Sequence, residues 1–194
     1  MIEFVRGKLA LRTDDSLVVD LGGFGMRMFV SKFSLAHFSP VALGEEIMVF
    51  CQLRLREDGA DLYGFYSQDE LRIFRLLNTI SGVGPKSAIS ILNIVSLEEL
   101  VSAISEKRVD LLTNASGVGR KTAERIILEL SGRVVAPRAD EIVKKMEIDQ
   151  DIVETLVGLG YRKDEAQRAM SRIDASVQDI NSRIKLALKI LAKR

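Results

Sequence analysis

The chain has 194 residues, of which 47% are hydrophobic and 28% are charged, with no tryptophan and a net charge of +1. This length allows one large domain or two to three small ones, and the balanced charge gives no bulk attraction to nucleic acid. One cysteine and one histidine exclude an intrachain disulfide framework and a Cys/His zinc cluster. We therefore expect no metal, no cofactor and no catalytic group.

The N-terminus lacks the layout of a signal peptide. No apolar run approaches the roughly 18 residues that a membrane span needs. The sequence therefore predicts a soluble, cytoplasmic protein that does not contact a membrane.

Residues 1–66 have the pattern of short β-strands. Apolar or alternating runs at 17–21, 26–30 and 47–55 are separated by glycine-containing segments. Leu53, Leu55 and Leu62 alternate with polar residues on either side of Asp58-Gly59, which predicts a β-hairpin. Cys51 lies in an apolar run and is predicted to be a small buried residue. A small closed barrel or a meander fits this region.

From Ser67 onward, apolar residues recur at helical spacing, and residues 67–133 are predicted to form short helices separated by glycine-rich turns. Residues 134–148 combine Pro137 with small and polar residues, which indicates a flexible linker. Residues 149–194 carry three apolar stripes, enough for a compact three-helix domain. The predicted fold class is therefore multidomain α+β.

The strongest signal is an internal repeat in the middle region. Residues 77–88 align with residues 112–123 without a gap, and Gly-Val-Gly, a lysine and a Ser/Thr coincide in the two copies. Each Gly-Val-Gly lies between two predicted helices. Glycines allow backbone angles that other residues avoid and let a ligand approach closely, and the valines are expected to point inward and anchor the turns.

Each turn should expose free backbone N–H groups at a helix N-terminus, where anions bind readily. Lys86 and Lys121 add a positive charge two residues after the second glycine. An alternative interpretation is a pair of ordinary helix connections with glycine caps. A nucleotide-binding P-loop is disfavoured, because neither lysine directly follows a glycine and helices rather than strands flank the turns.

The doubled turn resembles the helix-hairpin-helix motif of proteins that bind DNA without sequence preference, through phosphate contacts. With its flanking regions, the chain resembles the RuvA family of the bacterial Holliday-junction branch-migration complex along essentially its whole length. The resemblance rests on Arg6-Gly7, the Arg56-Glu57-Asp58 turn, residues 62–65, residues 119–125 and residues 156–161.

The resemblance implies an OB-fold barrel over 1–66, a tandem helix-hairpin-helix domain over 67–133 and a mobile UBA-like three-helix domain over 149–194. It implies a homotetramer that holds a four-way DNA junction open in recombination and repair. It does not decide whether one or two tetramers bind each junction. The third domain would recruit the hexameric RuvB ATPase, and the RuvC resolvase would be a further partner. The expected DNA-binding residues are Gly82, Val83, Gly84, Lys86, Ser87, Gly117, Val118, Gly119, Arg120, Lys121, Thr122 and Arg125.

Two adjacent carboxylates, Glu57 and Asp58, follow the first predicted strand of the hairpin. By themselves they indicate only a turn that contains Asp-Gly. The resemblance places them at the family's acidic pin, where repulsion of phosphates would guide strand separation.

Four apolar residues in the last region, Leu156, Leu159, Tyr161 and Leu188, are first of all core candidates. The resemblance implies that this apolar face contacts the motor, so both interpretations stay open for each residue.

Two other functions compete with a non-enzymatic junction-binding subunit. One is a helix-hairpin-helix DNA repair enzyme, such as a nuclease or glycosylase, which would need a catalytic Asp, Lys or metal cluster that the sequence does not show. The other is an assembly adaptor whose small C-terminal domain binds a protein, and the doubled hairpin argues against it.

Overall fold

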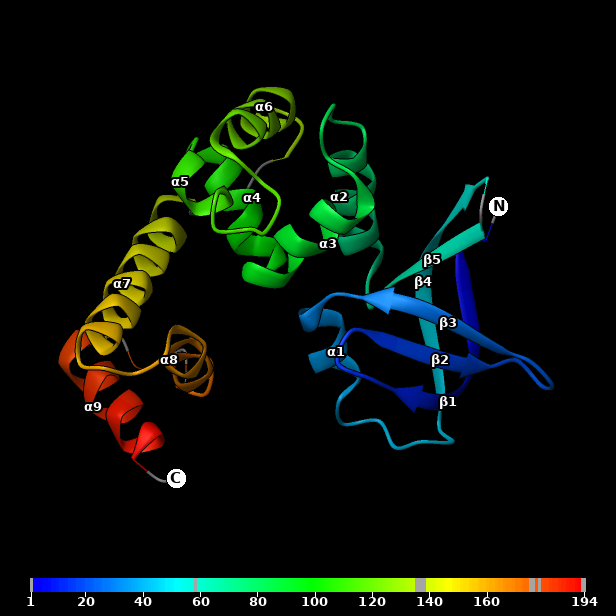
Figure 1. Cartoon of the computed structure of the whole chain (residues 1–194), viewed down its shortest axis with the longest axis horizontal. Coiled ribbons are helices and arrows are strands. Elements are labelled where there is room, and N and C mark those ends of the chain that lie inside the picture. Colours follow the sequence, from blue (N-terminus) through cyan, green and yellow to red (C-terminus); the bar gives the residue numbers. More distant parts are fainter. Residues whose placement is uncertain (1, 58, 135–138, 175–176, 178, 193–194) are drawn as a thin grey trace. The chain divides into compact units, whose positions relative to one another are not determined.

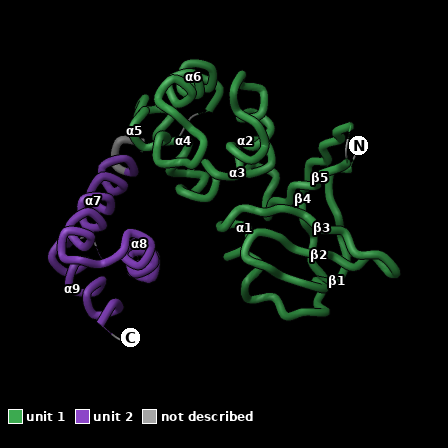
Figure 2. Tube along the Cα trace, in the orientation of Figure 1, with its two compact units in different colours: residues 1–137 green, residues 138–194 purple. Residues whose placement is uncertain are grey.

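The computed structural model describes residues 2–57, 59–134, 139–174, 177 and 179–192. The chain divides into two compact units, residues 1–137 and residues 138–194 (Figure 2). Each unit has its own core and is described by itself.

The first unit begins with a closed five-stranded barrel of the OB type (Figure 1). The strands β1 (Phe4–Arg12), β2 (Ser16–Asp20), β3 (Gly25–Val30), β4 (Glu46–Arg56) and β5 (Gly59–Phe65) follow the order β1-β2-β3-β5-β4 around it. The β3–β5 pair is parallel and the others are antiparallel. Helix α1 (Lys32–Phe38) lies between β3 and β4 in the chain. The barrel predicted from the sequence is confirmed.

Mostly aliphatic side chains fill the barrel. The buried residues include Leu9, Leu17, Val19, Met28 and Val49. Cys51 is fully buried among them, and this burial raises the pKa of its thiol to about 11. The thiol therefore stays protonated at neutral pH, which suits the predicted role of a small core residue.

The β4–β5 hairpin is long and regular, with pairs that run from Phe50 opposite Phe65 to Arg56 opposite Gly59. Gly64 of β5 lies between two neighbouring strands, opposite Val30 of β3 and Cys51 of β4. A Cβ atom there would come within 2.9 Å of the Val49 side chain and 3.0 Å of the Val30 side chain. The pairing extends to Arg56 and Gly59, so paired strands support the tip of the hairpin.

Helices α2 (Gln68–Asn78), α3 (Pro85–Ile94), α4 (Leu97–Ser105), α5 (Val109–Leu112) and α6 (Arg120–Leu130) complete the first unit. Their apolar faces meet in a core that includes Leu77, Ile91, Leu100, Leu112 and Ile126, each fully buried. Helix α4 begins with a capping box between Ser96 and Glu99, which satisfies two backbone N–H groups. The short helices and turns predicted from the sequence are present.

A buried carboxylate joins the barrel to the helices. Glu70 of α2 is only 2% exposed and accepts hydrogen bonds from the hydroxyls of Ser31 and Ser34, which lie at the start of α1. Burial raises the pKa of Glu70, and the two serine hydroxyls oppose that shift. Because both hydroxyls are themselves buried, they depend on Glu70 as their acceptor, and the bond fixes α2 against the barrel.

The second unit is a three-helix bundle of α7 (Ala139–Gly158), α8 (Lys163–Met170) and α9 (Ile180–Leu191). Its core contains Ile152, Leu156, Ala166 and Ala187. Arg183 is 5% exposed and forms an ion pair with Asp149, 2.6 Å between Nη2 and Oδ1. The predicted three-helix domain is thus present.

Helix α7 begins at Ala139, so most of the segment 134–148 that was expected to be a flexible linker is helical. The expectation relied on Pro137, but this residue precedes the helix and does not interrupt it. Between Ala139 and Val157 the sequence contains neither glycine nor proline, and Val143 and Met146 continue the apolar spacing toward Ile152 and Val153. The proposed domain boundaries near residues 67 and 149 stay predictions.

Among the helices of the described ranges, none alone is both long and apolar enough to cross a membrane. The pair α3 and α4 passes this test together, but the two helices meet at a bend of 98°.

Candidate nucleic-acid interface

The two Gly-Val-Gly segments form turns of nearly the same geometry. The first glycine of each has a positive φ, 89° at Gly82 and 77° at Gly117, a conformation that favours glycine. The last glycine of each is the N-cap of the next helix, with φ and ψ of −89° and 174° at Gly84 and −81° and 168° at Gly119. The sequence repeat is therefore also a structural repeat.

The central valines hold the turns to the core. Val83 and Val118 are both buried, each 5% exposed. Their N–H groups donate to the carbonyl oxygens of Ile80 and Ala115, at 3.0 and 3.1 Å. Since neither the side chains nor these N–H groups are available to a ligand, we assign both valines to support of the turn and not to direct DNA contact.

The helices that follow the turns begin without a side-chain cap. Neither Gly84 nor Gly119 has a side chain that could supply one, and no side-chain cap hydrogen bond is formed at either helix start within the described part of the chain. Elsewhere, Ser31, Ser67, Ser96 and Asp179 accept an amide hydrogen bond at the starts of α1, α2, α4 and α9. Pro85, the first residue of α3, has no N–H group, so α3 offers the N–H groups that follow it, while α6 offers its first ones. Both helix dipoles favour an anion at these groups.

The side chains around these openings are cationic or hydroxylic. Lys86 and Lys121 are exposed, while Ser87 and Thr122, one residue further along each helix, are half-buried. Arg120 forms an ion pair with Glu124, with 3.0 Å between Nε and Oε1. Both side chains are largely exposed. Such an exposed pair contributes little to stability, so Arg120 remains available to a phosphate.

Arg125 connects the two hairpins. Its Nη1 donates to the carbonyl oxygen of Ser81 at 3.0 Å, from the second helix of one hairpin to the turn of the other. A Cβ atom on Gly117 would lie 3.5 Å from the Ser87 hydroxyl, so the second turn adjoins the start of α3. The two openings are thus neighbours. The sequence marked Arg125 as a DNA contact but did not indicate this bond, because it depends on tertiary packing.

At the tip of the β4–β5 hairpin, Glu57 is exposed directly after β4. Arg56 forms an ion pair with Asp61 of β5, with 2.8 Å between Nη2 and Oδ2. Asp58 lies outside the described residues. The pin role of the carboxylate pair stays a prediction.

The structure sorts the four apolar candidates of the second unit. Leu156 is fully buried in the core, whereas Leu159 is 61% exposed in the turn that follows α7. Tyr161 and Leu188 are half-buried and pack against the core. Leu159 is therefore the candidate most available to a partner.

No group of three or more His, Cys, Asp or Glu side chains within the described ranges lies close enough together to hold a metal ion.

Comparison with known families gives one answer over the whole chain. Residues 1–64 match the family model for the RuvA N terminal domain, residues 74–131 a SAM-like helix-hairpin-helix tandem, and residues 148–192 the RuvA C-terminal domain. A protein of Caldanaerobacter subterraneus named Holliday junction branch migration complex subunit RuvA is 38% identical over 193 residues, the full length of both chains. The chain belongs to the RuvA family.

Other relatives with the same name are similar over their full length. The Acetivibrio thermocellus protein is 37% identical over 203 residues, and a Neisseria meningitidis protein is 38% identical over 204 residues. The resemblance inferred from the sequence is thereby confirmed.

Proposed function

We propose that this chain is the DNA-binding subunit of a Holliday-junction branch-migration complex. The observation that carries the proposal is the pair of adjacent, uncapped helix N-termini behind Gly84 and Gly119. Each offers backbone N–H groups and a lysine to a phosphate, and phosphates are the same at every base pair. The subunit therefore binds DNA without sequence preference and performs no chemistry itself, while a partner ATPase supplies the force.

Membership of the RuvA family supports the choice of a four-way junction as the substrate and of RuvB as the motor. The fourfold assembly and the RuvC contact that the resemblance implies stay predictions. In this proposal each copy of the chain grips one arm, and binding of several arms at once raises the affinity for a junction above that for a linear duplex.

Binding to a four-way junction should be at least about 100-fold tighter than binding to a linear duplex of the same length and composition, because several grips act together. An electrophoretic mobility-shift titration at fixed salt concentration measures both affinities. Equal affinities would contradict the junction assignment.

The double variant Lys86→Ala/Lys121→Ala should weaken binding equally on junctions of different sequence. It should also reduce the slope of log K against log salt concentration by about two for each copy of the chain bound, because two phosphate contacts are lost. The control is Lys144→Ala/Lys189→Ala, which removes two exposed lysines of the second unit. An unchanged slope in the first variant would show that these lysines do not contact phosphates.

The double variant Glu57→Ala/Asp58→Ala should bind the junction as tightly as the natural chain or up to about tenfold more tightly, because repulsion between carboxylates and phosphates is removed. The same mobility-shift titration measures the effect. A clear loss of affinity would contradict the repulsive role of the pair.

For the motor contact, Leu159→Ala should remove most of the stimulation of the RuvB ATPase and leave junction binding unchanged, because Leu159 is the exposed member of the apolar set. Leu156→Ala is the comparison. It should lower the melting temperature of the second unit, because it leaves a cavity in the core that costs about 2–5 kcal/mol. Full stimulation by Leu159→Ala would place the docking surface elsewhere.

A further inference from the structure

The barrel carries an exposed aromatic ring on its outer surface, at the base of the β4–β5 hairpin. Phe29 of β3 is 37% exposed and pairs in parallel with Tyr63 of β5. The centroids of the two rings are 6.0 Å apart, and their planes are tilted by 40°. Because Tyr63 is buried, Phe29 is the ring of this pair that a ligand can reach.

Two arginines lie on the same outer face of the sheet as Phe29. Residues along β3 alternate between exposed and buried at this end, and Arg27 and Phe29 are both exposed. Arg54 of β4 pairs with Asp61 of β5, two residues before Tyr63, so these side chains project from the same face. The exposed ring is therefore accompanied by cations from two strands.

This face carries positive charge that no carboxylate balances. The carboxylate of Asp61 is engaged by Arg56, at 2.8 Å, and accepts a hydrogen bond from the Tyr63 hydroxyl at 3.3 Å. Arg27 and Arg54 are exposed, and neither forms an ion pair with any residue that the structure describes. Unpaired cations beside an exposed ring suit a ligand in which a flat ring is attached to phosphates.

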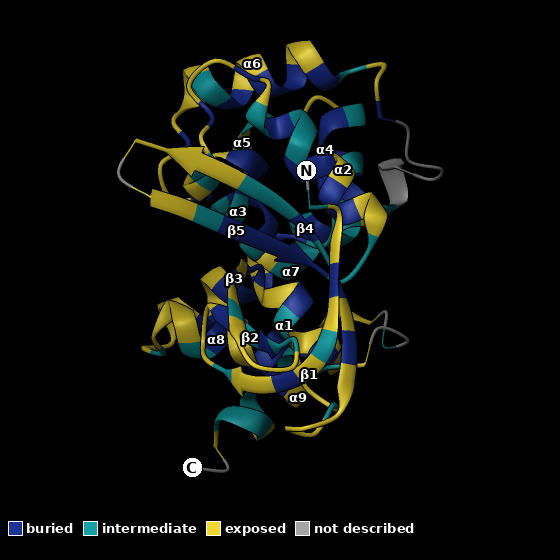
Figure 3. Cartoon of the chain, turned by 90° about the vertical axis from the view of Figure 1, so that its right-hand side faces the viewer, coloured by how far each residue is buried: buried dark blue, intermediate teal, exposed yellow. Residues whose placement is uncertain are grey.

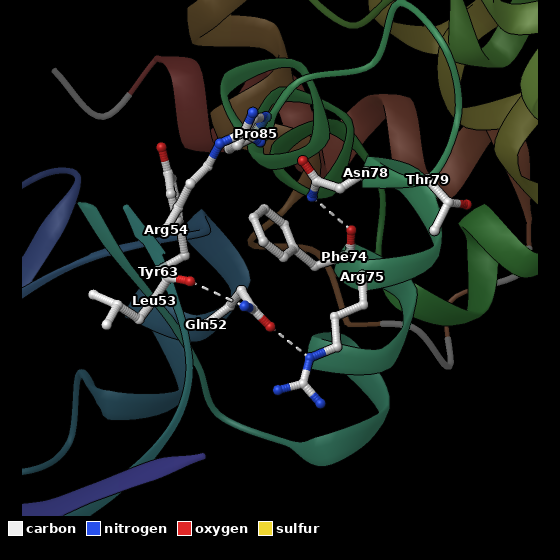
Figure 4. Close-up of a pocket in the computed structure, with 9 residues that line it drawn as sticks. All are labelled: Gln52, Leu53, Arg54, Tyr63, Phe74, Arg75, Asn78, Thr79 and Pro85. Carbon is white, nitrogen blue, oxygen red and sulfur yellow. Dashed lines mark hydrogen bonds between the residues drawn. The ribbon is translucent and has the colours of Figure 1, made fainter. Parts of the chain in front are cut away.

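The same face adjoins both parts of the proposed junction site. Tyr63 contacts Phe74 of α2, with 5.2 Å between ring centroids. These two residues line a pocket of about 350 Å³ together with Arg54 and with Pro85, the first residue of α3 (Figure 4). In the other direction, the β4–β5 hairpin continues to its tip at Glu57, and Figure 3 shows the outer end of this hairpin as exposed.

We propose that Arg27, Phe29 and Arg54 form a binding site for single-stranded DNA at the crossover of the junction, an inference that rests on the proposed function. One unpaired base stacks on the exposed ring of Phe29, and the two arginines bind neighbouring phosphates. Every base has a π face, so the site accepts any sequence. The face on strands 2 and 3 and the loop between strands 4 and 5 are also where OB-folds bind oligonucleotides.

The test compares two four-way junctions that differ only at the crossover. All bases are paired in one junction, and mismatches leave the bases next to the crossover unpaired in the other. The full chain should bind the second junction at least about fivefold more tightly, because no base pair has to be broken before a base stacks on Phe29. Mobility-shift titrations at fixed salt concentration measure the ratio of the two affinities.

The variant Phe29→Ala should bring this ratio to about one, because the stacking ring is lost, whereas Phe29→Tyr should retain it. The control is Phe24→Ala, which removes a ring that is 63% exposed at the opposite end of β3 and should leave the ratio unchanged. Each ratio compares two junctions with the same protein, so a partial loss of folded chain affects both affinities equally.

The arginines are tested by the salt dependence of binding to the unpaired junction. Arg27→Ala should lower the slope of log K against log salt concentration by about 0.7 for each copy of the chain bound, because one contact to a single-strand phosphate is lost. Arg172→Ala, which removes an exposed arginine of the second unit, should leave the slope unchanged.

Photocrosslinking locates the stacked base directly. Photoreactive 5-iodo-2′-deoxyuridine replaces an unpaired thymidine at the crossover, or a paired thymidine in the middle of an arm. After irradiation of the saturated complex, mass spectrometry should find the crossover crosslink on the peptide that contains Phe29. This crosslink should be at least about fivefold weaker from the mid-arm position.

A ratio of one for the natural chain, a ratio that Phe29→Ala leaves unchanged, or a crossover crosslink on other peptides would overturn the assignment while junction binding stands. An unchanged ratio together with a smaller assembly in sedimentation would instead place Phe29 in a contact between copies of the chain. A natural chain that binds a junction no better than a linear duplex would contradict the proposed function, and this site with it.

Discussion

The unpartnered N–H groups at the starts of α3 and α6 are the feature on which the rest of the site depends. Serine or aspartate side chains close the first turns of α1, α2, α4 and α9, whereas α3 and α6 begin at a glycine and have no such cap. Glycine at each N-cap leaves the N–H groups to water or to an anion, at the end of the helix where the dipole is positive. Glycine with positive φ, at Gly82 and Gly117, bends the chain into that position.

An anion site of this kind works only if the turns are held still. The buried side chains of Val83 and Val118 each fix one turn to the core. The hydrogen bond from Arg125 to the Ser81 carbonyl fixes one hairpin against the other. Glu70, through Ser31 and Ser34, fixes the first helix of the pair against the barrel. The barrel hairpin, with Glu57 at its tip, is thereby positioned relative to the two Gly-Val-Gly turns.

The features of the fold that depend on local sequence patterns were predicted from the sequence. Alternation predicted the barrel, and the repeat predicted two equal turns with buried valines. The sequence did not predict contacts between residues distant along the chain, such as the hydrogen bond from Arg125 to Ser81 or those from Ser31 and Ser34 to Glu70. Pro137 led to the expectation of a linker where α7 begins, because a proline before a helix and one that breaks a helix look alike locally. The difference between buried Leu156 and exposed Leu159 likewise required the packed bundle.

The central claim is that backbone N–H groups at the two turns bind phosphate, and the double variant Gly84→Ala/Gly119→Ala tests it most directly. Both glycines have φ and ψ that alanine adopts, and a Cβ atom meets nothing within 4 Å. The free energy of unfolding should therefore change by less than about 1 kcal/mol per site. The added methyl groups should obstruct the approach of phosphates and weaken junction binding at least tenfold. Unchanged junction affinity in a stably folded variant would contradict the account.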